Sequence, residues 1–360
     1  MCEKGWEKPS PVQTKTIPAI LSGKDVLARS KNGTGKTGAY VIPCLNQVNP
    51  SVNKIQVLIL VPVRELALQT SRIVKELGHS MKVSSMCCVG GQSLAKDMYV
   101  LQKGVQVLVG TSARILDIAK RGYCDLSSCK YVVLDEADKM LSEDFRPVVE
   151  ELLPFLSKDR QTMLFSATFP AAVKSFTQEH MKNPVFINMM EELTLQGITQ
   201  YYAFLEERQK VNALHTLFSK LEVNQSIIFC NSVRRVEILA KHIIDLGYSC
   251  FYIHSRMTPE DRNKVFHNFT QGNARHLVCT DLFARGVDVQ SVNVVINFDF
   301  PRSSETYLHR IGRSGRFGHL GLAVNFITES DKETFFTVEQ ELDTEIKPFP
   351  SEVDRNLYCV

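Results

Sequence analysis

Two short segments, each preceded by an apolar run typical of a β-strand, constrain the fold of this chain most strongly. The first is Ser30-Lys31-Asn32-Gly33-Thr34-Gly35-Lys36-Thr37, and the second is Asp135-Glu136-Ala137-Asp138. Glycines followed by a lysine are typical of a loop that wraps backbone N–H groups around phosphates at the start of a helix. Acidic residues after a buried strand lie where open α/β sheets bind ligands. Together, and in this order, the segments predict an α/β fold that hydrolyses a nucleoside triphosphate.

The first segment supplies the groups that bind ATP and Mg²⁺. We expect Lys36 to reach the β- and γ-phosphates and Thr37 to offer its hydroxyl to Mg²⁺. The predicted ATP-binding residues are Ser30, Lys31, Asn32, Gly33, Thr34, Gly35, Lys36 and Thr37. Ser30 stands where a glycine usually begins this pattern. The alternative interpretation of this segment, taken alone, is a surface turn rich in glycine and lysine.

The second segment supplies the acidic groups. Val132-Val133-Leu134 reads as a buried strand that delivers Asp135 to its carboxyl end. We expect Asp135 to hold the water shell of Mg²⁺ and Glu136 to orient and deprotonate the attacking water. The alternative interpretation is an exposed start of a helix. The catalytic residues predicted in this half are Lys36, Asp135 and Glu136.

Length and composition favour two domains in a reducing compartment. The chain has 360 residues, of which 44% are hydrophobic, and this exceeds what one core usually organises. Its net charge of +3 is too small to indicate nucleic-acid binding by itself. The ten cysteines include no Cys-x-x-Cys pair, which excludes the usual zinc and redox motifs. No apolar run approaches the length of a membrane span, and no secretory signal is present, so we expect no membrane partner.

Strand-like runs alternate with helical patterns along the whole chain, which predicts parallel, doubly wound sheets. The expected strands cover residues 56–61, 105–109, 131–134, 163–165, 226–230, 250–253, 276–279, 294–296 and 323–327. The composition places a boundary near 189–197. We therefore expect one domain over residues 1–190 and a second over 198–360.

The second half has no phosphate loop, but it has a cluster of arginines. His309-Arg310-Ile311-Gly312-Arg313-Ser314-Gly315-Arg316 sets three arginines around two glycines, so that guanidinium groups can approach phosphates closely. Arg313 and Arg316 are candidate arginine fingers, which stabilise charge in the transition state. A basic surface turn is the alternative interpretation. We expect residues of this half to complete the nucleotide-binding site.

The motifs, in their order, resemble those of DEAD-box ATP-dependent RNA helicases over essentially the whole chain. The resemblance implies two tandem RecA-like domains, with Gln13 reading adenine and Asp288 contacting the ribose. It implies RNA binding, independent of sequence and to single strands or short duplexes, by Arg64, Gly91, Thr111, Arg114, Asn231, Arg262 and Thr280. It also implies that Ser166, Thr168, Asp138 and His309 couple hydrolysis to strand separation.

Within this family, the chain is most similar to the Rck-type P-body helicases. Glu191-Glu192-Leu193-Thr194, Gln200-Tyr201-Tyr202-Ala203 and Asn297-Phe298-Asp299-Phe300-Pro301 carry this likeness, as does the segment 315–321. The resemblance implies weak intrinsic ATPase activity, stimulation by a deadenylase scaffold, and binding of decapping proteins by the second domain. It further implies translational repression, mRNA decapping, and a location in the cytoplasm, in P-bodies.

The chain departs from the family pattern mainly in its RNA-facing motifs. Val63 replaces a threonine, Ser112-Ala113 replaces Pro-Gly, and Pro259 replaces a glutamine. We expect the Ala113 methyl to crowd an RNA phosphate at a helix N-terminus. The sequence also begins close to Gln13, without the aromatic residue that family members stack on adenine, as expected of a truncated copy or of an incomplete gene model. Two hypotheses follow: an ATPase that remodels RNA, or a catalytically weak RNA clamp or scaffold that acts through protein partners.

Overall fold

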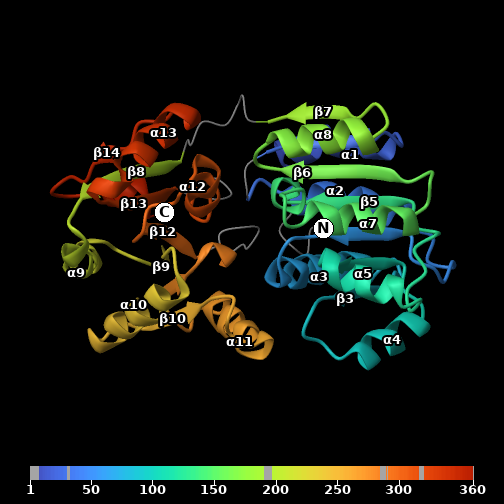
Figure 1. Ribbon diagram of the computed structural model, residues 1–360, viewed down its shortest axis with the longest axis horizontal. Helices are drawn as coiled ribbons and strands as arrows, with labels where there is room; N and C mark the ends of the chain where they lie inside the picture. Colours follow the sequence, from blue (N-terminus) through green and yellow to red (C-terminus); the bar gives the residue numbers. More distant parts are fainter. Residues whose placement is uncertain are drawn as a thin grey trace. The chain divides into compact units, whose positions relative to one another are not determined.

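The computed structural model describes residues 8–30, 33–189, 197–283, 289, 291–315 and 320–359. It divides the chain into two compact units, Met1–Glu192 and Leu193–Val360, and each is described below by itself (Figure 1). The predicted boundary near 189–197 falls largely outside the described residues. The domain ranges 1–190 and 198–360 remain predictions.

The described part of the first unit contains one sheet of seven parallel strands in the order β3-β4-β2-β5-β6-β1-β7. The strands are β1 (Val26–Arg29), β2 (Val57–Leu60), β3 (Ser85–Cys88), β4 (Val107–Gly110), β5 (Tyr131–Asp135), β6 (Gln161–Ser166) and β7 (Val185–Asn188). Every residue of β2, β4 and β6 is buried. This explains their continuous apolar runs, because helices cover both faces of a parallel sheet.

Two groups of helices cover the two faces of this sheet. α1 (Pro11–Leu21), α2 (Lys36–Gln47) and α3 (Arg64–Gly78) pack together. α5 (Ser112–Lys120), α6 (Ala137–Met140), α7 (Arg146–Leu152) and α8 (Ala171–His180) share a second apolar core, to which α4 (Leu94–Gln102) also contributes. Figure 1 shows α5, α7 and α8 in front of the strands and α2 behind them. This alternation is the doubly wound arrangement that the sequence predicts.

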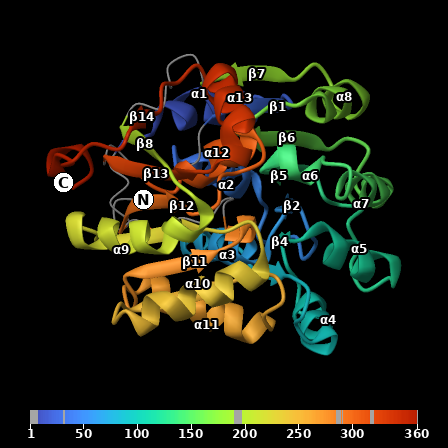
Figure 2. The same ribbon diagram turned by 60° about the vertical axis from the view of Figure 1, so that its left-hand side comes forward.

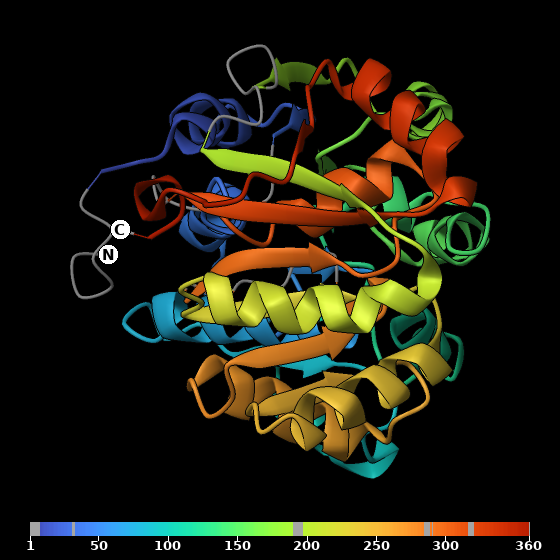
Figure 3. The same ribbon diagram turned by 90° about the vertical axis from the view of Figure 1, so that its left-hand side faces the viewer.

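The described part of the second unit repeats the architecture, in the strand order β10-β11-β9-β12-β13-β8-β14. These parallel strands are β8 (Ile198–Phe204), β9 (Gln225–Phe229), β10 (Cys250–Ile253), β11 (His276–Cys279), β12 (Val292–Asn297), β13 (Gly321–Ile327) and β14 (Lys347–Pro348). α9 (Lys210–Lys220) and α10 (Val233–Asp245) cover one face. α11 (Pro259–Thr270), α12 (Ser304–Ile311) and α13 (Lys332–Leu342) cover the other. Figures 2 and 3 turn the molecule to display this sheet, with the yellow helix α9 in front of it in Figure 3.

All nine predicted strands are present, with ends that differ by a few residues. The sequence did not yield bounds for β1 and β8, and it missed β3, β7 and β14. β3 has the sequence Ser-Met-Cys-Cys at a sheet edge, and β14 has only two residues, so neither carries the branched apolar run that signals a strand. None of the helices in the described ranges combines the length and the apolar character that a membrane span requires.

Candidate nucleotide and RNA sites

The glycine-rich loop connects β1 to α2, as the sequence predicts. Gly33 and Gly35 have φ angles of +78° and +94°, which side chains with a Cβ rarely adopt. α2 begins at Lys36, directly after this turn. Ser30 is fully buried, and its N–H donates to the carbonyl of Ser166 at the end of β6 (3.0 Å). The loop therefore starts from a rigid strand and presents a helix N-terminus, the arrangement that binds phosphate.

Gln13 is attached directly to this loop. Its side-chain Nε2 donates to the carbonyl of Gly35 (3.1 Å), and its Oε1 accepts from the N–H of Ser10 (3.0 Å). A Cβ at Gly35 would lie only 2.8 Å from both Gln13 Nε2 and Ser10 Oγ. A residue with a side chain would be strained by this φ angle and would displace the Gln13 amide and the Ser10 hydroxyl. The amide that the resemblance assigns to adenine thus also holds the phosphate loop.

The acidic segment lies at the carboxyl end of β5, and its carboxylates are buried. Asp135, Glu136 and Asp138 are each 3% exposed or less, which rules out the alternative of an exposed helix start. The Nζ of Lys36 lies 3.7 Å from Oε1 of Glu136. Glu136 adopts a left-handed backbone (φ +53°), which is strained for a residue with a side chain. Strain of this kind concentrates at functional sites.

Tyr40 of α2 contacts Asp135, a role that no motif in the sequence indicated. Its hydroxyl donates to Oδ2 of Asp135 (2.8 Å). Burial raises the pKa of Asp135 to about 6; the Lys36 charge lowers this pKa, the Glu136 charge raises it, and the Tyr40 hydrogen bond lowers it. The pKa of Tyr40 is raised well above its ordinary value, first by burial and second by the negative charge of Asp135. The tyrosine therefore remains a hydrogen-bond donor at neutral pH.

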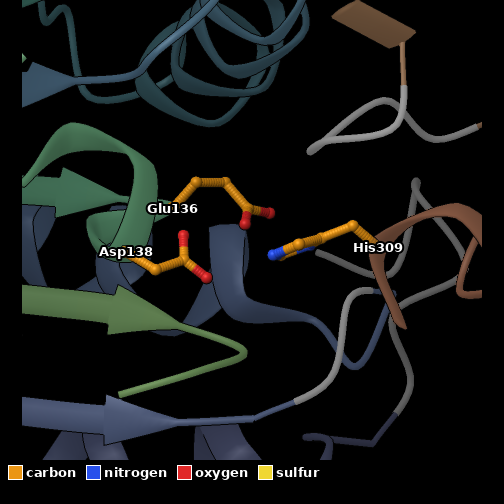
Figure 4. Close-up of side chains that lie close together, drawn as sticks. All are labelled: Glu136, Asp138 and His309. Carbon is orange, nitrogen blue, oxygen red and sulfur yellow. The ribbon is translucent and has the colours of Figure 1, made fainter. Parts of the chain in front are cut away.

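Asp138 lies beside Ser166, the last residue of β6, and beside Thr168, two residues further along the chain. Its N–H donates to Oγ of Ser166 (3.2 Å), and its Oδ2 accepts from the hydroxyl of Thr168 (2.6 Å). Figure 4 shows the Glu136 and Asp138 side chains on the segment after β5, and His309 on α12. Three of the predicted coupling residues, Asp138, Ser166 and Thr168, thus meet within the first unit.

The RNA-facing residues predicted in the first unit also lie together. Arg64 begins α3, Thr111 is the N-cap residue of α5, and Arg114 lies in the first turn of α5. Arg64 donates to the carbonyl of Gly90, and Arg114 donates to the carbonyl of Gln92 (3.1 Å). Gly91 lies between these two carbonyls, with φ +78°. Both guanidinium groups are thus directed to the backbone of one turn.

In the second unit, Arg310 binds several elements that carry the predicted RNA-facing residues. It donates to both carboxylate oxygens of Asp281 (2.6 and 3.1 Å) and to Oδ1 of Asn231 (2.7 Å). It also donates to Oδ1 of Asn297 (3.2 Å) and to the carbonyl of Asp299 (2.7 Å). Arg310 has no exposed surface. Thr280 lies next to Asp281, so Arg310 holds both the Asn231 and the Thr280 segments in place.

The remaining predicted residues of this unit lie on α11 and α12. Arg262 is in the first turn of α11, where its N–H donates to the carbonyl of Thr258 (3.0 Å). His309 is in the last turn of α12, with Nε2 3.9 Å from Oε1 of Glu305. Nε of Arg313 donates to the carbonyl of His309 (3.1 Å). Lys31, Asn32, Asp288 and Arg316 lie outside the described residues.

The three departures from the family pattern fall at helix starts. Val63 is the N-cap residue of α3 and makes no side-chain cap. Ser112 is buried at the first position of α5, and Ala113 is exposed at the second. Pro259 is the first residue of α11, a position where proline is favoured because no N–H is needed there. The local geometry of α5 and α11 accommodates these residues without backbone strain.

Comparisons with known proteins match both units. Residues 10–176 match the DEAD/DEAH box helicase family, and residues 209–318 match the helicase conserved C-terminal domain. The chain is 61% identical to DEAD-box ATP-dependent RNA helicase 6 of Arabidopsis thaliana, over 99% of this chain and 68% of that protein. It is 62% identical to ATP-dependent RNA helicase DHH1 of Coccidioides immitis, over 99% and 70%. These relatives support the resemblance to the Rck-type subgroup.

Solved structures agree with this placement. The structure of S. cerevisiae Dbp5 bound to RNA and ADP BeF3 has a TM-score of 0.89 at 30% identity, over 97% of this chain and 91% of that one. Mss116p bound to ssRNA and AMP-PNP has a TM-score of 0.88 at 26% identity, over 99% and 77%. Both units are therefore RecA-like domains, and the chain belongs to the DEAD-box family of ATP-dependent RNA helicases.

Proposed function

We propose that the chain binds RNA and ATP together, closes its two domains on them, and remodels RNA as ATP is hydrolysed. The observation that carries this proposal is the pairing of Lys36 with Glu136 (3.7 Å) beside Asp135, at the strand ends next to a glycine-rich loop. Such a pairing places a phosphate-binding cation next to a candidate base.

The residues at this edge also fit Mg²⁺. Mg²⁺ prefers hard oxygen ligands and retains several of its waters. Asp135 offers a buried carboxylate, and Thr37 offers a hydroxyl in the first turn of α2. Bound there with ATP, the ion would neutralise charge on the phosphates. Lys36 would bind the β- and γ-phosphates, and Glu136 would orient the attacking water and accept its proton.

The second domain would supply the remaining groups for ATP hydrolysis. Arg313 and Arg316 would stabilise the charge that develops on the transferred phosphoryl group, while Asp288 would bind the ribose. His309 would join Asp138, Ser166 and Thr168 in coupling hydrolysis to RNA release. These roles follow from the family motifs. They remain proposals for this chain.

RNA would be gripped through its sugar-phosphate backbone. Dbp5 and Mss116p, the two structural relatives above, were solved with RNA and a nucleotide analogue. In this chain the predicted RNA residues lie near the starts of helices and the ends of strands, where protein backbone can approach RNA phosphates closely. We therefore expect little base specificity. Local bending of one strand would release a short duplex.

For the cell, we propose a role in translational repression and mRNA decapping, in the cytoplasm and in P-bodies. The support is the identity of 62% with a DHH1 helicase and the subgroup motifs in the sequence. Decapping proteins and a deadenylase scaffold would be the partners, the scaffold acting as activator. Co-purification of these proteins with the tagged chain, and loss of repression of a tethered reporter mRNA when it is removed, would test this role.

The second candidate function is an RNA clamp or scaffold with little turnover. The departures Val63, Ser112-Ala113 and Pro259 favour it, whereas the intact Lys36 and Glu136 favour the ATPase. An ATPase assay on the purified chain with and without RNA separates the two. Turnover that rises with RNA supports the ATPase. RNA binding without turnover, even with the activating scaffold present, supports the clamp.

A further inference from the structure

Asp97, a residue outside the predicted site, holds one of the predicted RNA-binding arginines. It lies in the first turn of α4, and its carboxylate is 4% exposed. Oδ2 of Asp97 accepts hydrogen bonds from Nη2 (2.7 Å) and Nε (3.2 Å) of Arg114. A buried carboxylate is costly unless it is paired in this way. The pair therefore fixes the orientation of the Arg114 guanidinium.

The same guanidinium contacts the turn that contains Gly91. Nη2 of Arg114 donates to the carbonyl of Gln92 (3.1 Å), and Arg64 holds the carbonyl of Gly90 on the other side. The turn is also close to the start of α5, because the N–H of Thr111 donates to the carbonyl of Cys88 at the end of β3 (3.2 Å). The guanidinium groups of Arg64 and Arg114 thus both bind backbone carbonyls of this turn.

Next to the Gly91 turn, the start of α5 offers backbone N–H groups to an RNA phosphate. The first N–H groups of a helix have no partner within the helix, and the Thr111 side chain makes no capping bond to them. Helix N-termini of this kind bind phosphate well when their position is fixed. The position of α5 relative to the Gly91 turn depends on Arg114, and hence on Asp97.

We propose that Asp97 is a positioning residue for RNA: by holding Arg114 against the Gln92 carbonyl, it sets the Gly91 turn and the start of α5 so that their backbone N–H groups bind RNA phosphates. This inference rests on the proposed RNA-binding function. Arg114 then acts on RNA through the protein backbone.

Whether replacement of Asp97 weakens or strengthens RNA binding separates this account from simple electrostatic repulsion. Asp97 is a negative charge close to a surface that binds a polyanion. If it did no more than repel phosphates, its removal would strengthen RNA binding. If it positions Arg114, its removal weakens RNA binding.

The test is Asp97→Leu, which removes the charge and the acceptor but keeps the branching of the side chain. We expect the Kd for a labelled single-stranded RNA, measured with a non-hydrolysable ATP analogue, to rise about tenfold. The KM for RNA in the ATPase reaction should rise with it, whereas kcat at saturating RNA and the affinity for ATP without RNA should stay close to the parent's. Asp97→Asn, which keeps one oxygen acceptor, should give a smaller effect of the same sign and serves if the leucine variant does not fold.

Asp117→Leu is the matched control. Asp117 is also an ion-pair partner of Arg114, at 3.9 Å, but its side chain is 37% exposed and it mainly binds Arg121. It carries the same charge and lies on α5 itself. We expect its replacement to leave RNA affinity unchanged or slightly stronger.

A double substitution tests the route of the effect. If Arg114 acts only through the turn that Asp97 organises, Arg114→Gln should add little once Asp97 has been replaced. Independent, additive losses would overturn the proposal, as would unchanged or tighter RNA binding by Asp97→Leu. Failure of the unaltered chain to bind RNA would instead overturn the proposed function itself.

Discussion

The hydroxyl of Tyr40 donates a 2.8 Å hydrogen bond to the carboxylate of Asp135, and this bond ties helix α2 to the end of strand β5. Both side chains are buried. The bond favours the ionised form of Asp135 in a place where burial opposes it. The phosphate loop and the acidic segment are therefore linked electrostatically as well as by the fold.

The stability of the protein free of nucleotide and metal should depend on the ionisation of Asp135. Its pKa in the folded chain, about 6, lies above its ordinary value of 3.8. The folded chain thus holds this proton more tightly than the unfolded chain. The contribution of Asp135 to the free energy of unfolding is fully present below pH 3.8 and is lost as the pH rises towards 6.

We predict that the unfolding free energy of the parent, relative to Asp135→Asn, falls between pH 4 and pH 7 by on the order of 1–3 kcal/mol. Urea unfolding of both proteins at a series of pH values measures this. The exposed Asp159 provides the control, since Asp159→Asn should give a difference that is flat over the same range. A difference that grows with pH would show that Asp135 is ionised more easily than its burial implies.

Val63→Thr should stabilise the first unit. Val63 has the extended backbone of an N-cap residue (φ −133°, ψ 151°) but no side-chain oxygen that could accept a hydrogen bond from the first turn of α3. Threonine has nearly the same shape and supplies that oxygen, so we expect a gain of about 1 kcal/mol in the free energy of unfolding. Chemical denaturation measures it, with Val63→Ala as the comparison. Equal midpoints for the threonine and alanine variants would contradict the capping argument.

Arg310→Leu should destabilise the second unit strongly. The substitution leaves the partners Asn231, Asn297 and the Asp299 carbonyl without their donor, and we expect a loss of about 3–5 kcal/mol. Arg208, whose side chain is 83% exposed, offers the same substitution at the surface, where a change below about 0.5 kcal/mol is expected. Thermal unfolding of both variants compares them. Similar melting temperatures for the two variants would show that Arg310 is not needed to hold these segments together.

Restoring the family pattern at the start of α5 should tighten RNA binding. Ser112→Pro suits the first helical position, and Ala113→Gly removes an exposed methyl at the second. With a non-hydrolysable ATP analogue, single-stranded RNA should bind more tightly, by no more than about 1.5–3 kcal/mol, the value of one charge-assisted contact. ATP binding without RNA should not change. A titration of labelled RNA decides this, and equal affinities would show that the helix start already accommodates the methyl.

The sequence predicted most strands, and the positions of the glycine-rich and acidic segments at a helix start and a strand end, because their signals are local. The run before Asp135 and the glycines before Lys36 define a strand end and a helix start within a few residues. The roles of Tyr40, Asp97 and Arg310 depend on which segments lie next to them in space, and no spacing in the sequence reveals that. For the same reason, the family resemblance predicted RNA binding by Arg64 and Arg114 but did not reveal that their guanidinium groups bind the Gly90–Gln92 turn.

The central claim is that Glu136 activates water for ATP hydrolysis, and Glu136→Gln tests it most directly. Glutamine keeps the size of the side chain and meets the same left-handed backbone, but it cannot accept the proton. The decisive measurement is steady-state ATP turnover at saturating RNA, with ATP and RNA affinities measured on the same protein. We predict that turnover is abolished while both affinities are retained, and turnover close to that of the parent would contradict the account.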